Sequence, residues 1–348
     1  MKTSALHSAF AIAILCLLGT GCSRTKEQAQ ATGAAPAPRT HVKARLTWLY
    51  QSSYAPFLVA KEKGFYDKRG LDVEVLPSGP DLRPITTVAA GEDQIGVEGA
   101  SAIIQAATNN VPIVVVGTYL QRSAEVFMTR KSDNLTDIHS WKGKKVGLWV
   151  GTHVEPLLYA MLAKAGMTKA DVEIIPAKYD VVPFLQDGPD RVPIWNAYVY
   201  NEAQIPVEKG IAVDITTPES LGIQRAGEGI FASKAFAEKN PQAVAAFLAG
   251  TIEGIIYTNE HPDEAITILI SGKYGTGFDV AHQKKMLAAA LPLMIGPKQE
   301  PLKTDVELWR KTAATSFVDQ PKSSPDVDAL VKPIYWQQAK SMGTHDAK

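Results

Sequence analysis

Residues 46–76, LTWLYQSSYAPFLVAKEKGFYDKRGLDVEVL, decide the fold because they predict a strand, a loop, a helix and a second strand in close succession. The apolar run at residues 46–50 is typical of a buried strand. Residues 71–76 largely alternate between apolar and acidic side chains, which is the period-two pattern of a second strand. The pattern therefore predicts a βαβ unit, and ligands of such units bind beyond the carboxyl ends of the strands.

The helix of this unit has signals at both of its ends. Ser52 or Ser53 can cap its N-terminus, and Pro56 suits its first turn because a backbone N–H has no partner there. Gly64 is typical of a helix C-terminus. The loop between the strand and the helix therefore lies at the candidate ligand site.

Beyond this unit, predicted strands and helices alternate along the chain, which indicates an α/β fold with two largely parallel sheets. Residues 125–130 lead into a polar turn and predict a crossing from a first lobe to a second. Residues 229–233 predict the return crossing, because long helices follow without new strands. We expect one lobe at residues 42–128 and 230–348 and the other at residues 129–229, joined by a hinge.

The composition excludes several classes of function. The chain has 348 residues, 45% of them hydrophobic and 21% charged, which fits a soluble globular protein with room for two compact units. Lysine plus arginine and aspartate plus glutamate both number 36, so no broad positive field indicates nucleic acid. The seven histidines lack metal-ligand spacing, and no phosphate loop or activated-nucleophile motif occurs. We therefore predict a monomer without metal, cofactor, nucleic-acid partner or enzymatic activity.

The first residues predict export from the cytoplasm. The apolar stretch at residues 9–18 is too short to span a bilayer and is typical of a signal peptide, expected at residues 1–21. The small residues before Cys22 resemble a bacterial lipobox, so cleavage there and lipidation of the Cys22 thiol are the leading interpretation. An ordinary secretory signal is the alternative. Residues 22–41 are polar, with alanine, proline and glycine, and predict a flexible tether to the membrane.

Aromatic side chains concentrate where loops leave predicted strands. In a cleft between two lobes such rings can stack on a flat ligand, although the ends of strands also belong to cores. Trp48 and Trp195 are the pair that we expect to stack from opposite lobes. The full set of candidate rings is Trp48, Tyr50, Tyr54, Tyr119, Trp149, Trp195, Tyr198 and Tyr200.

Polar side chains at the same predicted edges suit an aminopyrimidine. Glu98, Asn201 and Glu202 offer the acceptors and donors that the edge of such a ring needs. Glu202 has a second interpretation, because a carboxylate at a helix N-terminus is stabilised by the helix dipole.

Other polar side chains suit an anion. Ser101 and Thr152 stand at predicted helix starts, where they could either bind an anion or cap the helix. Arg122 and Arg225 could add positive charge to such a site.

Three longer motifs resemble the periplasmic substrate-binding proteins of the thiamine-pyrimidine, riboflavin, sulfonate and nitrate group. They are GFYDKRGLDVEV at residues 64–75, WKGKKVGLW at residues 141–149 and YNEAQIPVEKGI at residues 200–211. The resemblance implies a bilobed, type II-like periplasmic-binding-protein fold, with a ligand cleft between two parallel-sheet lobes. It also implies a small-molecule ligand, an ABC permease and ATPase as partners, and a periplasmic location, with the lipid anchor holding the protein at the membrane.

The sequence is also similar to the fungal thiamine-pyrimidine synthase, which has the same fold. That enzyme uses pyridoxal phosphate held on a lysine and a histidine, together with a cysteine-rich loop. The matching positions here are Glu98, Ala102 and residues 225–229, so the Schiff-base amine and the thiols are missing. We therefore predict a binding protein for a thiamine-pyrimidine precursor or riboflavin. An alkanesulfonate, taurine or nitrate binder and a synthase-like enzyme are the alternatives.

Overall fold

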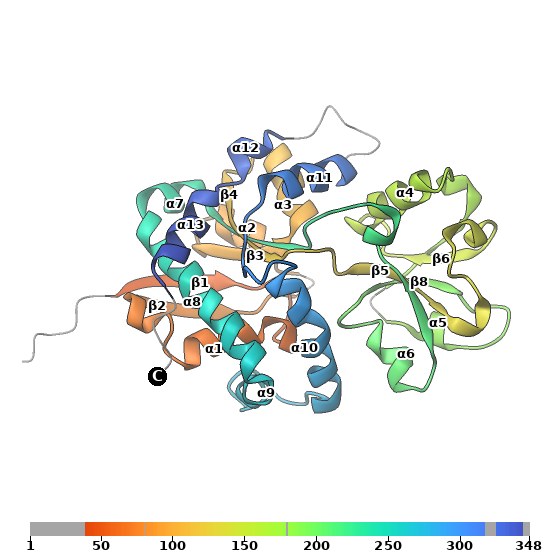
Figure 1. The fold of residues 1–348 in the computed structure, drawn as a ribbon, viewed down its shortest axis with the longest axis horizontal. Coiled ribbons are helices and arrows are strands. Elements are labelled where there is room, and N and C mark those ends of the chain that lie inside the picture. The colour runs from red at the N-terminus through yellow and green to blue at the C-terminus, as the bar shows by residue number, and fades with distance from the viewer. Residues whose placement is uncertain (1–38, 80, 179, 317–324, 344–348) are drawn as a thin grey trace, which may run out of the picture. The chain divides into compact units, whose positions relative to one another are not determined.

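The computed structural model describes residues 39–79, 81–178, 180–316 and 325–343 (Figure 1). The predicted signal peptide, Cys22 and the predicted tether up to residue 38 lie outside the described residues. None of the described helices has both the length and the apolar character that crossing a membrane requires. The described chain is built on two sheets of five strands each.

The first sheet mixes parallel and antiparallel pairs. Its strands, in spatial order, are β2 (Leu71–Leu76), β1 (Thr40–Arg45), β3 (Ile95–Gly99), β10 (Glu228–Ser233) and β4 (Ile113–Leu120). β1 pairs in parallel with β2 and β3, whereas β10 runs antiparallel between β3 and β4. The expectation of a parallel sheet is wrong for β10, because this strand comes from the second sheet and not through a crossover helix.

The second sheet repeats this arrangement. Its strands, in spatial order, are β7 (Glu173–Pro176), β6 (Lys145–Leu148), β8 (Ile194–Tyr198), β5 (Glu125–Arg130) and β9 (Val213–Thr216). β6 pairs in parallel with β7 and β8, while β5 runs antiparallel between β8 and β9. Both sheets are therefore mixed, and in each of them the antiparallel strand follows a connection between the sheets.

The connections between the sheets lie close to the predicted crossings. Residues 125–130 form β5 inside the second sheet, so the chain leaves the first sheet directly after β4. The predicted boundary between residues 128 and 129 falls within β5, and the boundary between residues 229 and 230 falls within β10. The connecting segments are therefore the residues just before β5 and just before β10.

The predicted βαβ unit is present with two local differences. Its helix, α1 (Ala55–Glu62), has Pro56 in the first turn, as predicted, and β2 is the predicted second strand. The first strand ends at Arg45, so residues 46–50 are the exit from β1 and not the strand itself. Neither serine caps α1, because both lie buried in a short 3-10 turn where the Ser52 hydroxyl donates to the Gln283 carbonyl at 2.7 Å.

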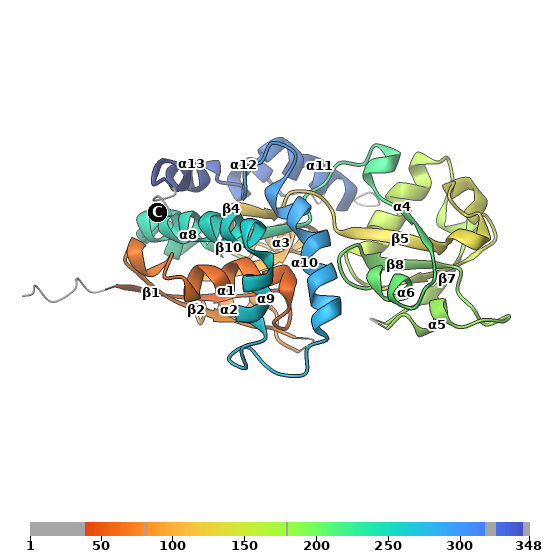
Figure 2. The ribbon, with the colours of Figure 1, turned by 60° about the horizontal axis from the view of Figure 1, so that its bottom comes forward.

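Helices cover both faces of the first sheet (Figures 1 and 2). Besides α1 they are α2 (Pro84–Ala89), α3 (Ala100–Thr108), α7 (Lys234–Lys239), α8 (Pro241–Glu260), α9 (Pro262–Leu269), α10 (Val280–Ile295), α11 (Val306–Ser316), α12 (Val327–Leu330) and α13 (Pro333–Ser341). In β4, Val114 and Val116 pack with Phe247 of α8, whereas Val115 packs with Trp309 of α11. Alternate side chains of a strand point to opposite faces, so each face has its own core.

The second sheet is also buried on both faces. Its helices are α4 (Val154–Lys164), α5 (Val182–Leu185) and α6 (Gln204–Glu208). Phe127 of β5 packs with Trp141 on one face, while Met128 packs with Trp195 on the other. The ring of Trp195 lies over Gly147, where an added Cβ would be only 2.2 Å from the ring carbon Cε3. The missing side chain at Gly147 is therefore what admits this tryptophan.

Candidate functional site

Three buried carboxylates meet where the chain passes between the two sheets. Glu98 lies near the end of β3, and Glu228 begins the neighbouring β10, opposite Gly99. Glu125 begins β5 in the second sheet. The pKa of Tyr198 is raised by burial and by the charges of nearby glutamates, including all three of these. We name these glutamates and the side chains that face them the junction cluster, which consists of Glu98, Glu125, Glu228, Tyr54, Tyr198, Tyr200 and His153.

Glu125 is held in its ionised form by its neighbours. Nε2 of His153, at the N-terminus of α4, lies 2.8 Å from Oε1 of Glu125, and the Ser123 hydroxyl donates to Oε2. Burial opposes ionisation, but the bond and charge of His153, with the charge of Arg225, bring the pKa of Glu125 down from 4.5 to about 2. Glu125 therefore carries a negative charge throughout the neutral pH range.

Glu228 behaves in the opposite way. Burial, followed by the charges of Glu98 and Glu125, raises its pKa from 4.5 to about 8, although the hydroxyls of Tyr54 and Tyr200 oppose the rise. Tyr54 donates to Oε1 at 3.3 Å, while the buried Oε2 has no hydrogen-bond partner among the described residues. At neutral pH this carboxyl group is mostly protonated, so it offers an O–H donor beside an acceptor oxygen.

Glu98 adds a third acceptor to the group. It is 4% exposed, accepts a hydrogen bond from the Gly99 N–H at 2.9 Å, and has a pKa that burial raises. In the described part of the chain, no set of histidine, cysteine, aspartate or glutamate side chains is arranged to hold a metal ion. The carboxylate oxygens of Glu98 and Glu125 suit a ligand that brings hydrogen-bond donors.

Aromatic rings from both halves of the chain surround these carboxylates. The ring centroid of Tyr198 lies 5.3 Å from that of Trp149 and 5.5 Å from that of Tyr200, on which it stacks. Tyr54, which follows β1, stacks on Tyr119 at 6.3 Å. The structure therefore brings the predicted residues Tyr54, Glu98, Trp149 and Tyr198 to one place.

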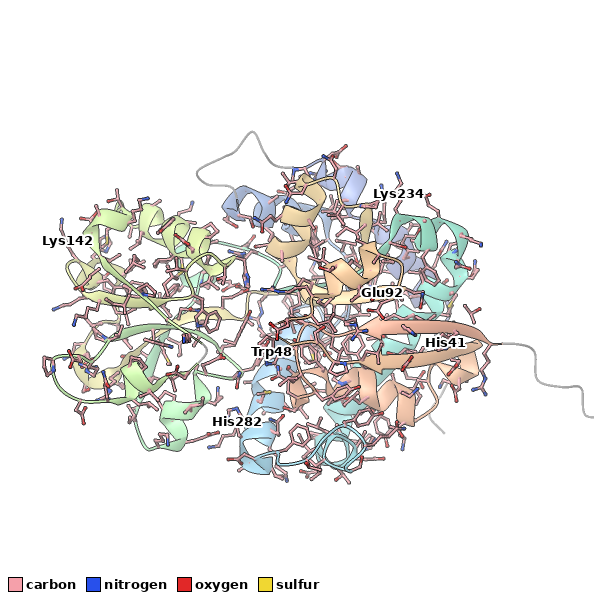
Figure 3. All side chains as sticks on the ribbon, turned by 180° about the vertical axis from the view of Figure 1, so that it is seen from behind. His41, Trp48, Glu92, Lys142, Lys234 and His282 are labelled. Carbon is pink, nitrogen blue, oxygen red and sulfur yellow. The ribbon has the colours of Figure 1, made fainter. Side chains whose placement is uncertain are left out.

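Two of the predicted rings have roles within the first sheet. The Tyr119 hydroxyl donates to the Ser53 carbonyl at 2.6 Å, which fixes the turn before α1. Trp48 is half-buried, packs against the core of the first sheet and accepts a backbone bond from the Ser78 N–H at 3.0 Å (Figure 3). The Tyr119 ring therefore packs against Tyr54, and its hydroxyl holds the turn that carries Tyr54.

The predicted hydroxyl residues also bond within the protein. Ser101 accepts a hydrogen bond from the guanidinium of Arg225. Thr152 donates its hydroxyl to the Trp149 carbonyl at 2.7 Å and closes the turn before α4. For Thr152, local turn bonding thus accounts for the hydroxyl, while the N-cap position of α4 is His153.

The predicted Asn201–Glu202 pair organises the turn after β8. The two carboxylate oxygens of Glu202 accept from the Tyr198 N–H at 2.9 Å and from Nδ2 of Asn201 at 3.1 Å. Oδ1 of Asn201 lies 3.0 Å from Nε2 of His282, which belongs to α10 (Figure 3). This pair therefore connects the two halves of the chain, and Glu202 has the role of a turn carboxylate.

Trp195 does not face the junction cluster, which corrects the expectation that it stacks on a ligand. Its side chain is 1% exposed and packs between Gly147 and Met128 in the core of the second sheet. The reason is the period-two alternation of β8, in which Trp195 and Asn196 point to opposite faces. Tyr198 and Tyr200, at and after the end of β8, belong to the junction cluster, and the buried ring of Trp149 contacts Tyr198.

Sequence reasoning missed the two carboxylates that define the site. Glu125 was hidden within the predicted crossing and Glu228 within the segment compared with a cysteine-rich loop. A usable signal was present, because each glutamate stands at the first residue of a strand that directly follows a connection between the sheets. Charged residues at such a position lie near the hinge of a two-lobed protein.

Comparison with known proteins identifies the family of this chain. Residues 51–265 match the family described as NMT1/THI5 like. A relative from Haemophilus influenzae, named for thiamine biosynthesis, is 29% identical over 66% of this chain and 72% of its own length. The riboflavin-binding protein RibY of Chloroflexus aurantiacus is 25% identical over 86% of this chain and 88% of its own length. The formylaminopyrimidine-binding protein of Halalkalibacterium halodurans is 23% identical over 82% of this chain and 88% of its own length.

Solved structures show the same fold. The aliphatic sulphonate-binding protein SsuA of Escherichia coli superimposes with a TM-score of 0.63 at 19% identity, covering 86% of this chain and 91% of its own. The nitrate-binding protein NrtA of Synechocystis has a TM-score of 0.65 at 15% identity, covering 89% of this chain and 90% of its own. The two mixed α/β sheets therefore have the fold found in periplasmic binding proteins.

Proposed function

Because this chain belongs to the NMT1/THI5-like family and has the fold of periplasmic binding proteins, we propose that it captures a heteroaromatic nutrient for an ABC importer. The ligand is a thiamine-pyrimidine precursor or a flavin such as riboflavin. The observation that carries this proposal is the buried, unpartnered Oε2 of Glu228 within a group of three carboxylates in the described chain. Relatives named for riboflavin and formylaminopyrimidine binding support the same ligand class.

A protonated Glu228 can pair with one edge of an aminopyrimidine. Its O–H donates to a ring nitrogen, while its other oxygen accepts from the neighbouring amino N–H. The ionised Glu125 favours N–H donors close by, and Trp149 with Tyr198 can supply a stacking face. A stacked ring contributes on the order of 1 kcal/mol beyond its burial.

A sulfonate or nitrate would meet charge of its own sign at this site. It would approach the ionised Glu125 and two further carboxyl groups, so its burial would be opposed by repulsion. The two cations near Glu125 are His153 and Arg225, and both already act on Glu125 itself. We therefore prefer the heteroaromatic ligand over the anionic ones.

Ligand capture would couple to movement between the two sheets. Glu98 and Glu228 belong to the first sheet, whereas Glu125 and Tyr198 belong to the second. A ligand that contacts both groups binds the closed arrangement more tightly and shifts the population toward it. The importer would recognise that closed arrangement.

A thermal-shift panel tests the ligand class. An aminopyrimidine or riboflavin is expected to raise the melting temperature, whereas taurine and nitrate are not, because a ligand that binds only the native state stabilises it. Isothermal titration calorimetry then gives the affinity. A shift with taurine and none with any heterocycle would overturn the proposal.

Variants at Glu228 sharpen the same test. Glu228→Leu should weaken aminopyrimidine binding by about 1–3 kcal/mol, because the paired bonds are lost. Glu228→Gln should retain most of the affinity, since an amide offers a donor and an acceptor in the same places. Glu300→Gln, in an ion pair away from the junction cluster, is the control. Equal losses in the leucine and glutamine variants would exclude pairing by a protonated carboxyl group.

Membrane anchoring through Cys22 is proposed from the sequence, since this residue lies outside the described part of the chain. Cys22→Ser is expected to release the exported protein from the membrane fraction, because the thiol that carries the lipid is gone. Mass spectrometry of the mature N-terminus measures the modification directly. An unmodified thiol, or cleavage at another site, would show that the protein is secreted without an anchor.

A further inference from the structure

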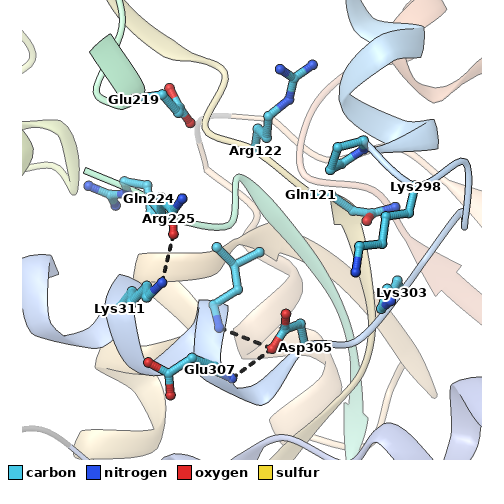
Figure 4. A pocket seen from close by; sticks show the side chains of 12 residues that line it. Gln121, Arg122, Glu219, Gln224, Arg225, Lys298, Lys303, Asp305, Glu307 and Lys311 are labelled. Atoms are coloured by element: carbon cyan, nitrogen blue, oxygen red, sulfur yellow. Dashed lines mark hydrogen bonds between the residues drawn. The ribbon is translucent and has the colours of Figure 1, made fainter. Parts of the chain in front are cut away.

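A cavity of about 270 Å³ lies beside the two segments that connect the sheets (Figure 4). Gln121 and Arg122 line it from the segment after β4, and Gln224 and Arg225 line it from the segment before β10. Glu219 lines it from the same chain segment before β10, and the remaining lining comes from α11 and from the connection between α10 and α11, which includes Lys298. Both connecting segments therefore share this cavity, which we name the hinge pocket.

The hinge pocket has an excess of positive charge. Five cationic side chains line it, and Lys303 is paired with Glu300 at 2.6 Å. Lys311 donates to the uncharged Gln224 amide oxygen at 2.7 Å. Within the described ranges, no ion pair involves the other four cations, which are Arg122, Arg225, Lys298 and Lys311.

The acidic side chains of the hinge pocket do not neutralise these cations. Asp305 accepts the Glu307 N–H at 2.9 Å at the start of α11, and Glu307 itself pairs with Arg310 at 3.2 Å. Burial raises the pKa of Glu219, and the charge of Arg122 opposes that rise. Because five cationic and three acidic side chains line the pocket, an added anion would find more positive than negative charge around it.

Arg225 is the residue that points to a missing partner. Its side chain is 2% exposed, and its Nη2 donates to the Ser101 hydroxyl. Its Nε and Nη1 are buried and have no hydrogen-bond partner among the residues that the structure describes. Buried guanidinium donors without an acceptor are costly, so an acceptor is expected beside them.

We propose that the hinge pocket binds a small oxyanion, such as inorganic phosphate, through Arg225 and the neighbouring lysines. A guanidinium matches the oxygens of such an anion in a planar, two-bond geometry. Because Arg225 also contacts Ser101 at the start of α3, a bound anion would act on the helix that follows Glu98. A bound anion would thus shift the hinge equilibrium from outside the junction cluster. By linkage, nutrient binding would change the affinity for the anion by the same factor.

Calorimetric titration with inorganic phosphate tests this proposal on the exported protein, at an ionic strength held constant with sodium chloride. The double variant Lys298→Gln, Lys311→Gln is expected to weaken phosphate binding about tenfold or more, because two charge-assisted contacts are removed. Lys209→Gln, an exposed lysine that does not line the pocket, is the matched control and should bind phosphate as wild type does.

The outcomes separate this site from the proposed nutrient site. Saturable phosphate binding that only the pocket variant loses would support the oxyanion site, whether or not a heterocycle binds. Wild-type phosphate affinity in the double variant, or no phosphate effect beyond that of sodium chloride, would overturn it. The Glu228→Leu variant should still bind phosphate, since Glu228 does not line the hinge pocket.

Discussion

Glu228→Gln is expected to become more stable relative to wild type as the pH rises from about 4.5 to about 8. Burial raises the pKa of Glu228 to about 8 in the folded protein, above its ordinary value of 4.5. Between these values the folded chain keeps a proton that the unfolded chain has released, so a rising pH favours unfolding of the wild type. Glutamine has no such proton, and its contribution should stay constant.

The expected size of this effect is large for a single side chain. A pKa shift from 4.5 to about 8 corresponds to at most roughly 4–5 kcal/mol, since each unit is about 1.4 kcal/mol. The difference in unfolding free energy between variant and wild type should grow across the window and level off above the folded-state pKa. Below the unfolded value the carboxyl group is protonated in both states, so the difference should be smallest there.

Urea denaturation at about pH 5 and about pH 8 measures this difference. Glu300→Gln is the control, because ion pairs with Lys303 and Lys340 lower the pKa of Glu300 to about 2 and keep it ionised across the window. Its stability relative to wild type should not change between the two conditions. If Glu228→Gln and wild type lose stability equally over this range, Glu228 is not protonated in the folded protein.

Gly147→Ala is expected to destabilise the protein by about 3 kcal/mol, because the new methyl group has no room. Its Cβ would lie 2.2 Å from the ring of Trp195, a distance that requires the ring or the strand to shift. Trp195 is 1% exposed and packed on all sides, so its ring cannot move without disturbing Met128 and the rest of that core. The loss should appear as a lower denaturation midpoint.

A double-mutant cycle with Trp195→Leu isolates this contact. The smaller side chain should remove most of the penalty of alanine at position 147, which gives a coupling energy of about 1–3 kcal/mol. Gly79→Ala is the matched control, because nothing lies within 4 Å of its added Cβ. Independent, additive effects of Gly147→Ala and Trp195→Leu would mean that the ring does not lie over Gly147.

Local sequence signals were enough to predict much of the first βαβ unit. The apolar and acidic alternation produced β2, and Pro56 lies in the first turn of α1 as predicted. Gly64 follows this helix with a φ of 71°, which glycine adopts without strain. These features depend on residues within a few positions of one another. The fold class was predicted from the family resemblance of the longer motifs.

The tertiary structure decided which strands pair and which side chains meet. β10 and β5 run antiparallel to their neighbours because each enters a sheet from a connection, and no local pattern encodes that pairing. Trp149, directly after β6, contacts Tyr198 of the site, whereas Trp195, within β8, packs into the core on the other face of the second sheet. Alternation along a strand separates its two faces but does not say which face meets the other half of the chain.

The junction cluster was likewise decided in three dimensions. Glu125 and Glu228 are about a hundred residues apart, and each alone reads as an ordinary surface carboxylate. Only the approach of the two sheets removes them from water and places them beside Glu98, which separates their pKa values to about 2 and about 8. Desolvation and the charge of neighbours depend on distance in space, and the sequence by itself holds neither quantity.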